Sequence, residues 1–282
     1  MTATRRGLLR TFAGSAAIMT FSALGAFNQA AAASLDEIKK RGYMTVATED
    51  DFQPFEYIVN GKPTGYDQDL MEAMEPTLPF HVRQSIIPWT GILPGITTGK
   101  YDLAVTAILI TAARMQVLDF CSPIAESVDY YLKRTKDDSI HAIADLSGKP
   151  LGVEAGSAML KLLPELDAML KKTGGHLGKV VQYQSYPEAY QDLAVGRVDY
   201  VVNTLLNVQS VAAARPNVFA VGQAVSKPVY IAWAVQKGNT GLRDLINAQL
   251  AAAKKNGTMA KLQQKYFGLT FADLPVQPIA NV

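Results

Sequence analysis

The sequence has little of the chemistry that most enzymes and metalloproteins use. Its 282 residues include one cysteine, Cys121, and three histidines, His81, His141 and His176. A single cysteine excludes an internal disulfide, and histidines this far apart form no metal-ligand motif. Because Cys121 lies in an apolar stretch, we expect a buried thiol and no nucleophile. We therefore expect no catalytic residue, no metal and no cofactor, and we expect the histidines at the surface.

An excess of charge of one sign is also missing once the N-terminus is set aside. The chain has 27 Lys and Arg residues against 25 Asp and Glu residues, and residues 1–33 contain Arg5, Arg6 and Arg10 but no acid. Subtracting these three arginines from the 27 leaves 24 basic residues. No basic stripe remains that would predict binding to nucleic acid or to an anionic membrane.

Residues 1–33 resemble an export signal. Arg5 and Arg6 precede an apolar, alanine-rich stretch over residues 11–27, and small residues lead up to Ser34. This stretch is shorter than the roughly 20 apolar residues that a membrane span needs. The arginine pair resembles a twin-arginine signal, and an ordinary secretory signal with two arginines is the alternative. We expect cleavage near Ala33 and a mature protein in the periplasm.

Alternating helical and extended patterns predict an α/β protein. Ser34 and Glu37 form a capping box for a helix that Gly42 ends. Strands then alternate with helices, which predicts parallel sheets covered on both faces. The expected strands are 43–48, 80–86, 102–108, 128–134, 150–154, 180–183, 200–202, 218–221 and 228–235. The expected helices are 67–74, 93–98, 159–172, 188–195, 205–214, 241–255 and 258–267.

The two βα series predict two lobes. A polar stretch, 135–139, follows the first series, and we expect the last two helices to return to the first lobe. The expected divisions are an export signal at 1–33, the first lobe at 34–128, the second lobe with its hinge strands at 129–230, and completion of the first lobe at 231–282. We expect the chain to cross between the lobes twice, near 128–133 and near 227–232.

Arg114 follows a buried strand at the carboxyl edge of the first predicted sheet. Open α/β folds bind ligands at this edge, and a guanidinium matches a carboxylate through two parallel hydrogen bonds. The sequence therefore predicts a small ligand that bears a carboxylate. The alternative is that Arg114 forms an ion pair with a neighbouring acid such as Asp119.

Seven segments, in order, resemble the polar-amino-acid type of periplasmic solute-binding protein (family 3) of ABC importers. They are QPFEY (53–57), GYDQDL (65–70), WTGILPGITTGKYDLAV (89–105), TAARMQVLDFCSP (111–123), ADLSGKPLGVEAGS (144–157), SYPEAYQDLAVGRVDYVV (185–202) and NGTMAKLQQKYFG (256–268). The resemblance implies a type II periplasmic-binding-protein fold, in which two lobes, each a mostly parallel sheet flanked by helices, close about two hinge crossovers. It also implies a monomer that binds an amino acid or related organic acid and delivers it to an ABC permease in the inner membrane.

The same resemblance implies roles for individual residues. Arg114 matches the arginine that grips the ligand carboxylate, and Ser157 matches a contact from the second lobe to the same group. Phe52 and Trp89 match an aromatic pair that sandwiches the ligand, with ordinary core packing as the alternative. The remaining expected contacts are Glu49 at the distal end of the ligand, Glu154 facing the cleft, Ala107, Asn203 and Thr204.

Two positions depart from the family pattern. Leu109 stands where the family usually has a Ser or Thr that donates to the carboxylate. Thr204 stands where an Asp usually binds the α-ammonium, and a shift of one residue would place Asn203 there without restoring an acid. A hydroxyl does not compensate a buried ammonium as a carboxylate does. We therefore expect an amino-acid derivative, a betaine-like compound or another small organic acid in preference to a common α-amino acid. Glu49, Glu154 and the aromatic faces would meet its cation.

Two other classes of protein use a similar fold. A cyclohexadienyl-dehydratase-like enzyme would carry a GGTNERF-like stretch where this chain reads EAGSAMLK (154–161), although Glu154 would still be an acid in the cleft. The sensor domain of a membrane receptor would carry a transmembrane segment after the lobes, and the sequence ends at Val282 without one. We therefore expect a binding protein rather than an enzyme or a receptor domain.

Overall fold

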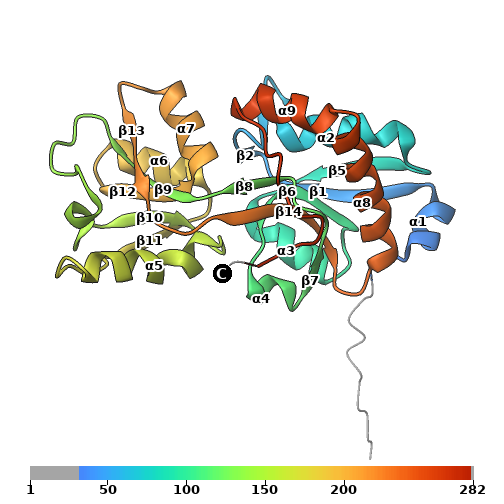
Figure 1. The fold of residues 1–282 in the computed structure, drawn as a ribbon, viewed down its shortest axis with the longest axis horizontal. Coiled ribbons are helices and arrows are strands. Elements are labelled where there is room, and N and C mark those ends of the chain that lie inside the picture. Colours follow the sequence, from blue (N-terminus) through green and yellow to red (C-terminus); the bar gives the residue numbers. More distant parts are fainter. Residues whose placement is uncertain (1–31, 281–282) are drawn as a thin grey trace, which may run out of the picture.

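The computed structural model describes residues 32–280, so nearly all of the expected export signal lies outside the described part. Two lobes lie side by side, and two extended stretches of chain run between them (Figure 1). This arrangement confirms the predicted two-lobed α/β fold. Within residues 32–280, no helix has the length and apolar character needed to span a membrane.

The first lobe contains a sheet of six strands in the order β5-β1-β6-β14-β7, with β8 also paired to β14. β1 pairs in parallel with β5 and β6, whereas β14 runs antiparallel to β6, β7 and β8. The strands are β1 (Tyr43–Thr48), β5 (His81–Ile86), β6 (Leu103–Leu109), β7 (Leu118–Phe120), β8 (Ala125–Ser127) and β14 (Val229–Gln236). The helices are α1 (Leu35–Arg41), α2 (Tyr66–Met74), the short η1 (Glu75–Thr77), α3 (Trp89–Thr97), α4 (Ala112–Met115), α8 (Thr240–Lys255) and α9 (Thr258–Phe267).

The second lobe contains a five-stranded sheet in the order β11-β10-β12-β9-β13. β10 pairs in parallel with β11 and β12, whereas β9 runs antiparallel to β12 and β13. The strands are β9 (Asp129–Arg134), β10 (Leu151–Glu154), β11 (Val180–Tyr183), β12 (Tyr200–Thr204) and β13 (Phe219–Ala224). The helices are η2 (Ile143–Leu146), α5 (Met159–Lys171), α6 (Tyr186–Ala194) and α7 (Leu205–Ala214).

Both sheets are more mixed than the sequence predicted, and the crossovers explain why. The parallel strands of each lobe end toward the other lobe, as the βα units require. β9 and β14 instead enter their sheets directly from a crossover, so each points away from the lobe that the chain has just left (Figure 1). These two strands therefore run antiparallel to their neighbours.

The two crossovers lie against each other. The chain leaves the first sheet after Ser127 and enters the second at Asp129, and it returns between Ala224 and Val229. The backbone N–H of Asp129 donates to Ser226 Oγ at 2.9 Å, and the N–H of Val225 donates to the Asp129 carbonyl at 2.8 Å. Paired crossovers of this kind restrict the relative motion of two lobes to a hinge. The residues at which each lobe begins and ends stay a prediction.

Local sequence signals account for the start of the first lobe, but they missed a small sheet. The Ser34–Glu37 capping box is present, and Gly42 ends α1 in the left-handed conformation at φ 77°. Between β1 and α2 lie β2 (Asp51–Phe52), β3 (Glu56–Val59) and β4 (Lys62–Thr64), which form a three-stranded antiparallel sheet. Strands of two to four residues are too short to show an alternating pattern, so the sequence predicted only a loop here.

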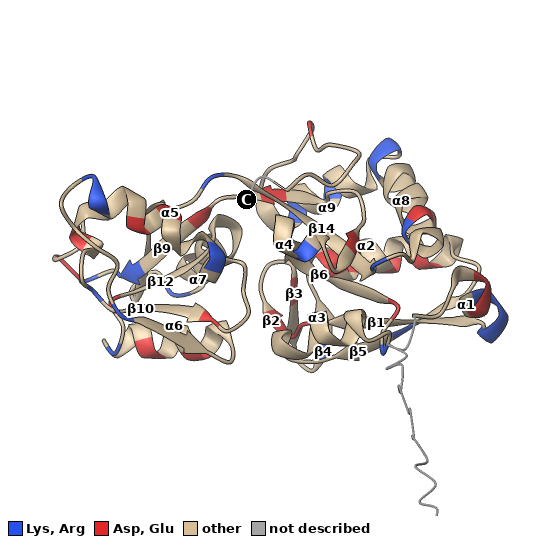
Figure 2. Cartoon of the chain, turned by 90° about the horizontal axis from the view of Figure 1, so that it is seen from below, with Lys and Arg blue, Asp and Glu red and all other residues tan. Residues whose placement is uncertain are grey.

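The cysteine and the three histidines, residue types that often serve in catalysis or metal binding, lie in unreactive positions. Cys121 is fully buried, and burial raises the pKa of its thiol to about 12. His81, His141 and His176 are exposed and separate from one another. Basic and acidic residues are interspersed over both lobes (Figure 2). These positions agree with the expectation of a buried, inert thiol and surface histidines.

Candidate functional site

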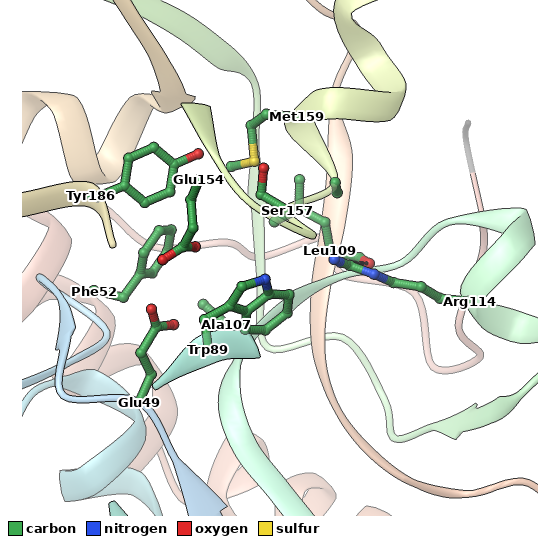
Figure 3. A pocket seen from close by; sticks show the side chains of 11 residues that line it. Glu49, Phe52, Trp89, Ala107, Leu109, Arg114, Glu154, Ser157, Met159 and Tyr186 are labelled. Carbon is green, nitrogen blue, oxygen red and sulfur yellow. Dashed lines mark hydrogen bonds between the residues drawn. The ribbon is translucent and has the colours of Figure 1, made fainter. Parts of the chain in front are cut away.

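A narrow cavity of about 20 Å³ lies between the two lobes (Figure 3). This is room for about one water molecule, so the two lobes are almost closed on each other. The lining residues from the first lobe are Glu49, Phe52, Trp89, Ala107, Leu109 and Arg114. Those from the second lobe are Glu154, Ser157, Ala158, Met159 and Tyr186.

The carboxyl ends of three parallel strands deliver several of these side chains. Glu49 directly follows β1, Leu109 ends β6 and Glu154 ends β10. The first residues of two helices supply aromatic rings, because Trp89 begins α3 and Tyr186 begins α6. The site therefore occupies the sheet edges at which open α/β folds bind ligands, with one edge contributed by each lobe.

Arg114 provides a positive charge in the cavity wall. It lies in α4, where its backbone N–H donates to the N-cap Thr111 at 3.2 Å. Its guanidinium donates to the carbonyl oxygens of Leu109 at 3.0 Å and Gly156 at 3.2 Å. Burial lowers the pKa of Arg114 to about 10, so the group stays charged at neutral pH.

No carboxylate of the described chain, residues 32–280, forms an ion pair with Arg114. Asp119, the alternative partner suggested by the sequence, instead pairs with Lys237 at 2.9 Å. The guanidinium also lies 5.1 Å from the centre of the Trp89 ring. A charged group with only neutral partners in a cavity wall suits a small anionic ligand.

Carboxyl groups gather in another part of the cavity. Oxygen atoms of Glu49, Asp51 and Glu154 lie within 4.8 Å of one another. Burial raises the pKa of Glu154 to about 8, and burial with repulsion from Glu154 raises that of Glu49 well above its usual value. Burial also raises the pKa of Asp51. These carboxyls could hold a cation, either a metal ion or a positively charged part of a ligand.

Aromatic rings form the apolar walls. Phe52 from β2 and Trp89 from α3 are both buried, and both line the cavity. Phe52 lies 5.9 Å from Tyr186, centre to centre, in a tilted contact that joins the two lobes. The Tyr186 hydroxyl donates to the Val202 carbonyl at 3.2 Å, which fixes the position of its ring. In Figure 3 the Trp89 indole lies between the two glutamates and Arg114.

Seven of the nine site residues predicted from the sequence line this cavity, and two do not. Asn203 is fully buried, and its amide donates to Tyr190 Oη at 2.9 Å and to Asn207 Oδ1 at 2.8 Å. Thr204 is fully buried at the end of β12, opposite Asp129 on β9. Both lie in the second sheet, outside the cavity lining. Ligand contact by each of the nine residues stays a prediction.

The sequence did not identify Ala158, Met159 and Tyr186 as cavity residues. For Tyr186 a signal was available, because it begins a helix after a strand in the second lobe, as Trp89 does in the first. Ala158 and Met159 follow Ser157 at the start of α5, and only the folded loop shows which of their side chains reach the cavity. Leu109 was noted as a departure from the family pattern and contributes apolar lining.

Two lobes, paired crossovers and a charged inter-lobe cavity define a protein that encloses a small solute. Residues 44–269 match the bacterial extracellular solute-binding proteins, family 3, and the chain belongs to this family. This match confirms the resemblance found in the sequence. The family is one of binding proteins, and its description as extracellular agrees with an exported protein.

Individual relatives support this assignment. The probable amino-acid-binding protein YxeM of Bacillus subtilis (strain 168) is 29% identical over 216 residues, which cover 76% of this chain and 80% of YxeM. The structure of an ancestral arginine-binding protein bound to arginine is 34% identical and has a TM-score of 0.71, with 81% of this chain and 99% of that chain covered. The ancestral amino acid-binding protein AncCDT-1, a precursor of cyclohexadienyl dehydratase, is 30% identical with a TM-score of 0.72, covering 82% and 98%.

Proposed function

We propose that this protein is the substrate-binding component of an ABC importer and delivers a small carboxylate-bearing solute to a permease in the inner membrane. One observation carries the proposal, namely the charged guanidinium of Arg114 in the inter-lobe cavity without a carboxylate partner in residues 32–280. A ligand carboxylate would accept hydrogen bonds from this group and neutralise its charge. Membership of the solute-binding family supports the transport role.

The proposed ligand is an amino-acid derivative, a betaine-like compound or another small organic acid, in preference to a common α-amino acid. Leu109 offers the cavity no hydroxyl, and Thr204 lies outside the lining. Acidic groups that could meet a cation are Glu49 and Glu154 instead. Because one structural relative was solved with arginine, L-arginine is the standard amino acid with which the proposed ligands should be compared.

We also propose that the protein reaches the periplasm as a monomer after a leader of the twin-arginine type is removed near Ala33. The support is the basic, acid-free, alanine-ending segment 1–33. N-terminal sequencing of the exported protein would locate the cleavage site, and retention of an intact leader in the cytoplasm would contradict export. Unchanged export of the Arg5→Lys, Arg6→Lys double variant would contradict only the twin-arginine route.

Native mass spectrometry of the protein purified from its own periplasm tests the transport proposal. We expect a co-purified solute of low mass that bears a carboxylate. Calorimetry with that solute should then show saturable binding of one molecule per protein. Turnover of prephenate- or arogenate-like acids by the purified protein would instead support the dehydratase alternative, and binding without turnover would argue against it.

A further inference from the structure

Glu49 and Glu154 face each other across the lobe interface. Glu49 follows β1 in the first lobe and Glu154 ends β10 in the second, yet their oxygen atoms lie within 4.8 Å. Both side chains are almost fully buried, with 4% and 2% of their surfaces exposed. Their carboxyl groups point toward each other in Figure 3, on the opposite side of Trp89 from Arg114.

The surroundings of this pair do not compensate two negative charges. Oε1 of Glu154 is buried and receives no hydrogen bond from any N–H or hydroxyl of residues 32–280. Two buried, ionised carboxylates this close to each other repel. The pair therefore needs a positive charge, which either a proton or another cation can supply.

The charged and titratable groups around Glu49 and Glu154 increase the need for a positive charge there. Asp51 and Glu56 add further negative charge near Glu49, and Asp51 acts on Glu154 in the same sense. Arg114 is the cation that acts on Glu154, but it lies on the other side of the Trp89 ring. The other titratable groups that face these carboxyls or Asp51 are Tyr186, Tyr190, Asp50 and Glu188.

We propose that Glu49 and Glu154 form a cation subsite divided between the lobes, which holds a proton in the ligand-free closed form and exchanges it for a positively charged nitrogen of the ligand. This inference rests on the proposed function, since it requires a solute in the same cavity with its carboxylate on Arg114. The substrate class that follows is a zwitterion whose cationic group and carboxylate lie at opposite ends. A guanidinium or a quaternary ammonium fits this class, because each keeps its positive charge at neutral pH and gives up no proton to the carboxylates.

The exchange conserves both protons and charge. A protonated carboxyl releases H⁺ to solvent, and the resulting carboxylate pairs with the ligand cation. Because the two acids belong to different lobes, ionising both without a cation would push the lobes apart. The ligand cation removes that repulsion, so binding of the distal group and closure of the lobes are coupled.

Titration calorimetry with two matched acids tests the exchange. The probes are 4-guanidinobutanoate, which carries a distal cation, and 4-ureidobutanoate, which has the same shape without the charge. Measurements in two buffers of different ionisation enthalpy give the number of protons released. With the wild type at about pH 7, the guanidino acid should bind with release of about one proton or more, and its affinity should rise at least about tenfold from about pH 6 to about pH 7. The ureido acid should bind more weakly and release none.

Two variants separate the pair from its neighbours. Glu154→Gln should reduce the proton release and flatten the pH dependence for the guanidino acid. Asp138→Asn is the matched control, because it removes an exposed carboxylate outside the cavity lining, and it should behave as the wild type. Infrared spectroscopy of the ligand-free protein at neutral pH needs no probe, and it should show a protonated-carboxyl band that weakens in Glu154→Gln. If that variant does not fold, Glu49→Gln replaces it.

Several results would overturn the inference. Equal binding of both acids, or binding of the guanidino acid without proton release, would leave the carboxylate-binding function intact and remove the cation exchange. An infrared band of equal strength in the wild type and in Glu154→Gln would also overturn it. Binding of calcium by Glu49 and Glu154, in place of the guanidino acid, would do the same. Failure of all small carboxylates, including the co-purified solute, to bind would instead refute the proposed function itself.

Discussion

The guanidinium of Arg114, in the first lobe, donates a hydrogen bond to the carbonyl oxygen of Gly156, in the second lobe, at 3.2 Å. The carbonyl is neutral, so this contact joins the lobes without compensating the charge of the arginine. A ligand carboxylate at the same place would contact both lobes only when they are closed. A ligand that binds one of two states preferentially shifts the protein toward that state.

Replacing Arg114 by Ala should therefore weaken ligand binding by about 2 to 5 kcal/mol, because a carboxylate would enter the cavity without its cation. Arg114→Lys should restore part of the loss, since an ammonium cannot donate in the same forked geometry. Calorimetry with the co-purified solute measures both effects. Arg83→Ala, an exposed position on β5, is the control. Unchanged affinity of Arg114→Ala would contradict the carboxylate site.

Ligand binding should close the lobes about the paired crossovers. The hydrogen bonds between Asp129 and residues 225–226 keep the two crossovers together, so the expected motion is a hinge rather than a separation. Small-angle scattering should show a smaller radius of gyration with saturating solute than without it. An identical radius in a sample proven to be saturated would contradict closure.

Stability should depend on pH through Asp129, whose pKa burial raises to about 7, with a further contribution from Glu165. The folded state therefore holds a proton that the unfolded state releases near pH 4. The stability contributed by this proton is complete below about pH 4 and is lost as the pH rises through about 7. Asp129→Asn should match the wild type at low pH and gain on the order of 2 to 4 kcal/mol above about pH 7.

Urea unfolding at several pH values measures this gain. Asp138→Asn is the matched control, because Asp138 is exposed in the same part of the second lobe. We expect it to follow the wild type at every pH. A difference between Asp129→Asn and the wild type that is constant with pH would show that the Asp129 proton does not contribute.

The Thr204→Asp substitution places at this position the acid that the family usually has, and its effect on stability can be measured. Thr204 lies opposite Asp129 in the ladder between β12 and β9, so both side chains are on one face. A second acid there should destabilise the protein by about 1 to 3 kcal/mol at neutral pH. In the Thr204→Asp, Asp129→Asn double variant that repulsion is absent. Urea unfolding should therefore give this double variant a stability closer to that of the wild type, and because residue 204 lies outside the cavity lining, its affinity for the solute should change little. Tight wild-type binding of a standard L-amino acid, with its ammonium on Thr204, would contradict the preferred ligand class.

Local patterns in the sequence were enough to predict much of the fold. The capping box at Ser34, the alternation of strands and helices, and the position of Arg114 after β6 all depend on residues close together in the chain. The directions of β9 and β14 were not predictable in this way, because the crossovers determine them. The small sheet β2-β3-β4 was missed because each of its strands is too short for a pattern.

The site was predictable where one residue type implies one chemistry. A guanidinium at a sheet edge indicates an anion, so Arg114 could be found. The approach of Glu49 to Glu154 could not, because it depends on how closely the two lobes pack. The same limit applies to Asn203 and Thr204, whose burial in the second sheet reflects hydrogen bonds with α6 and α7 and pairing with β9.

A crystal structure of the protein with its co-purified solute tests the central claim most directly. The account predicts one solute in the cavity between the lobes, with its carboxylate within hydrogen-bonding reach of the Arg114 guanidinium. A solute bound outside this cavity, or bound inside it with no acidic group on Arg114, would contradict the account.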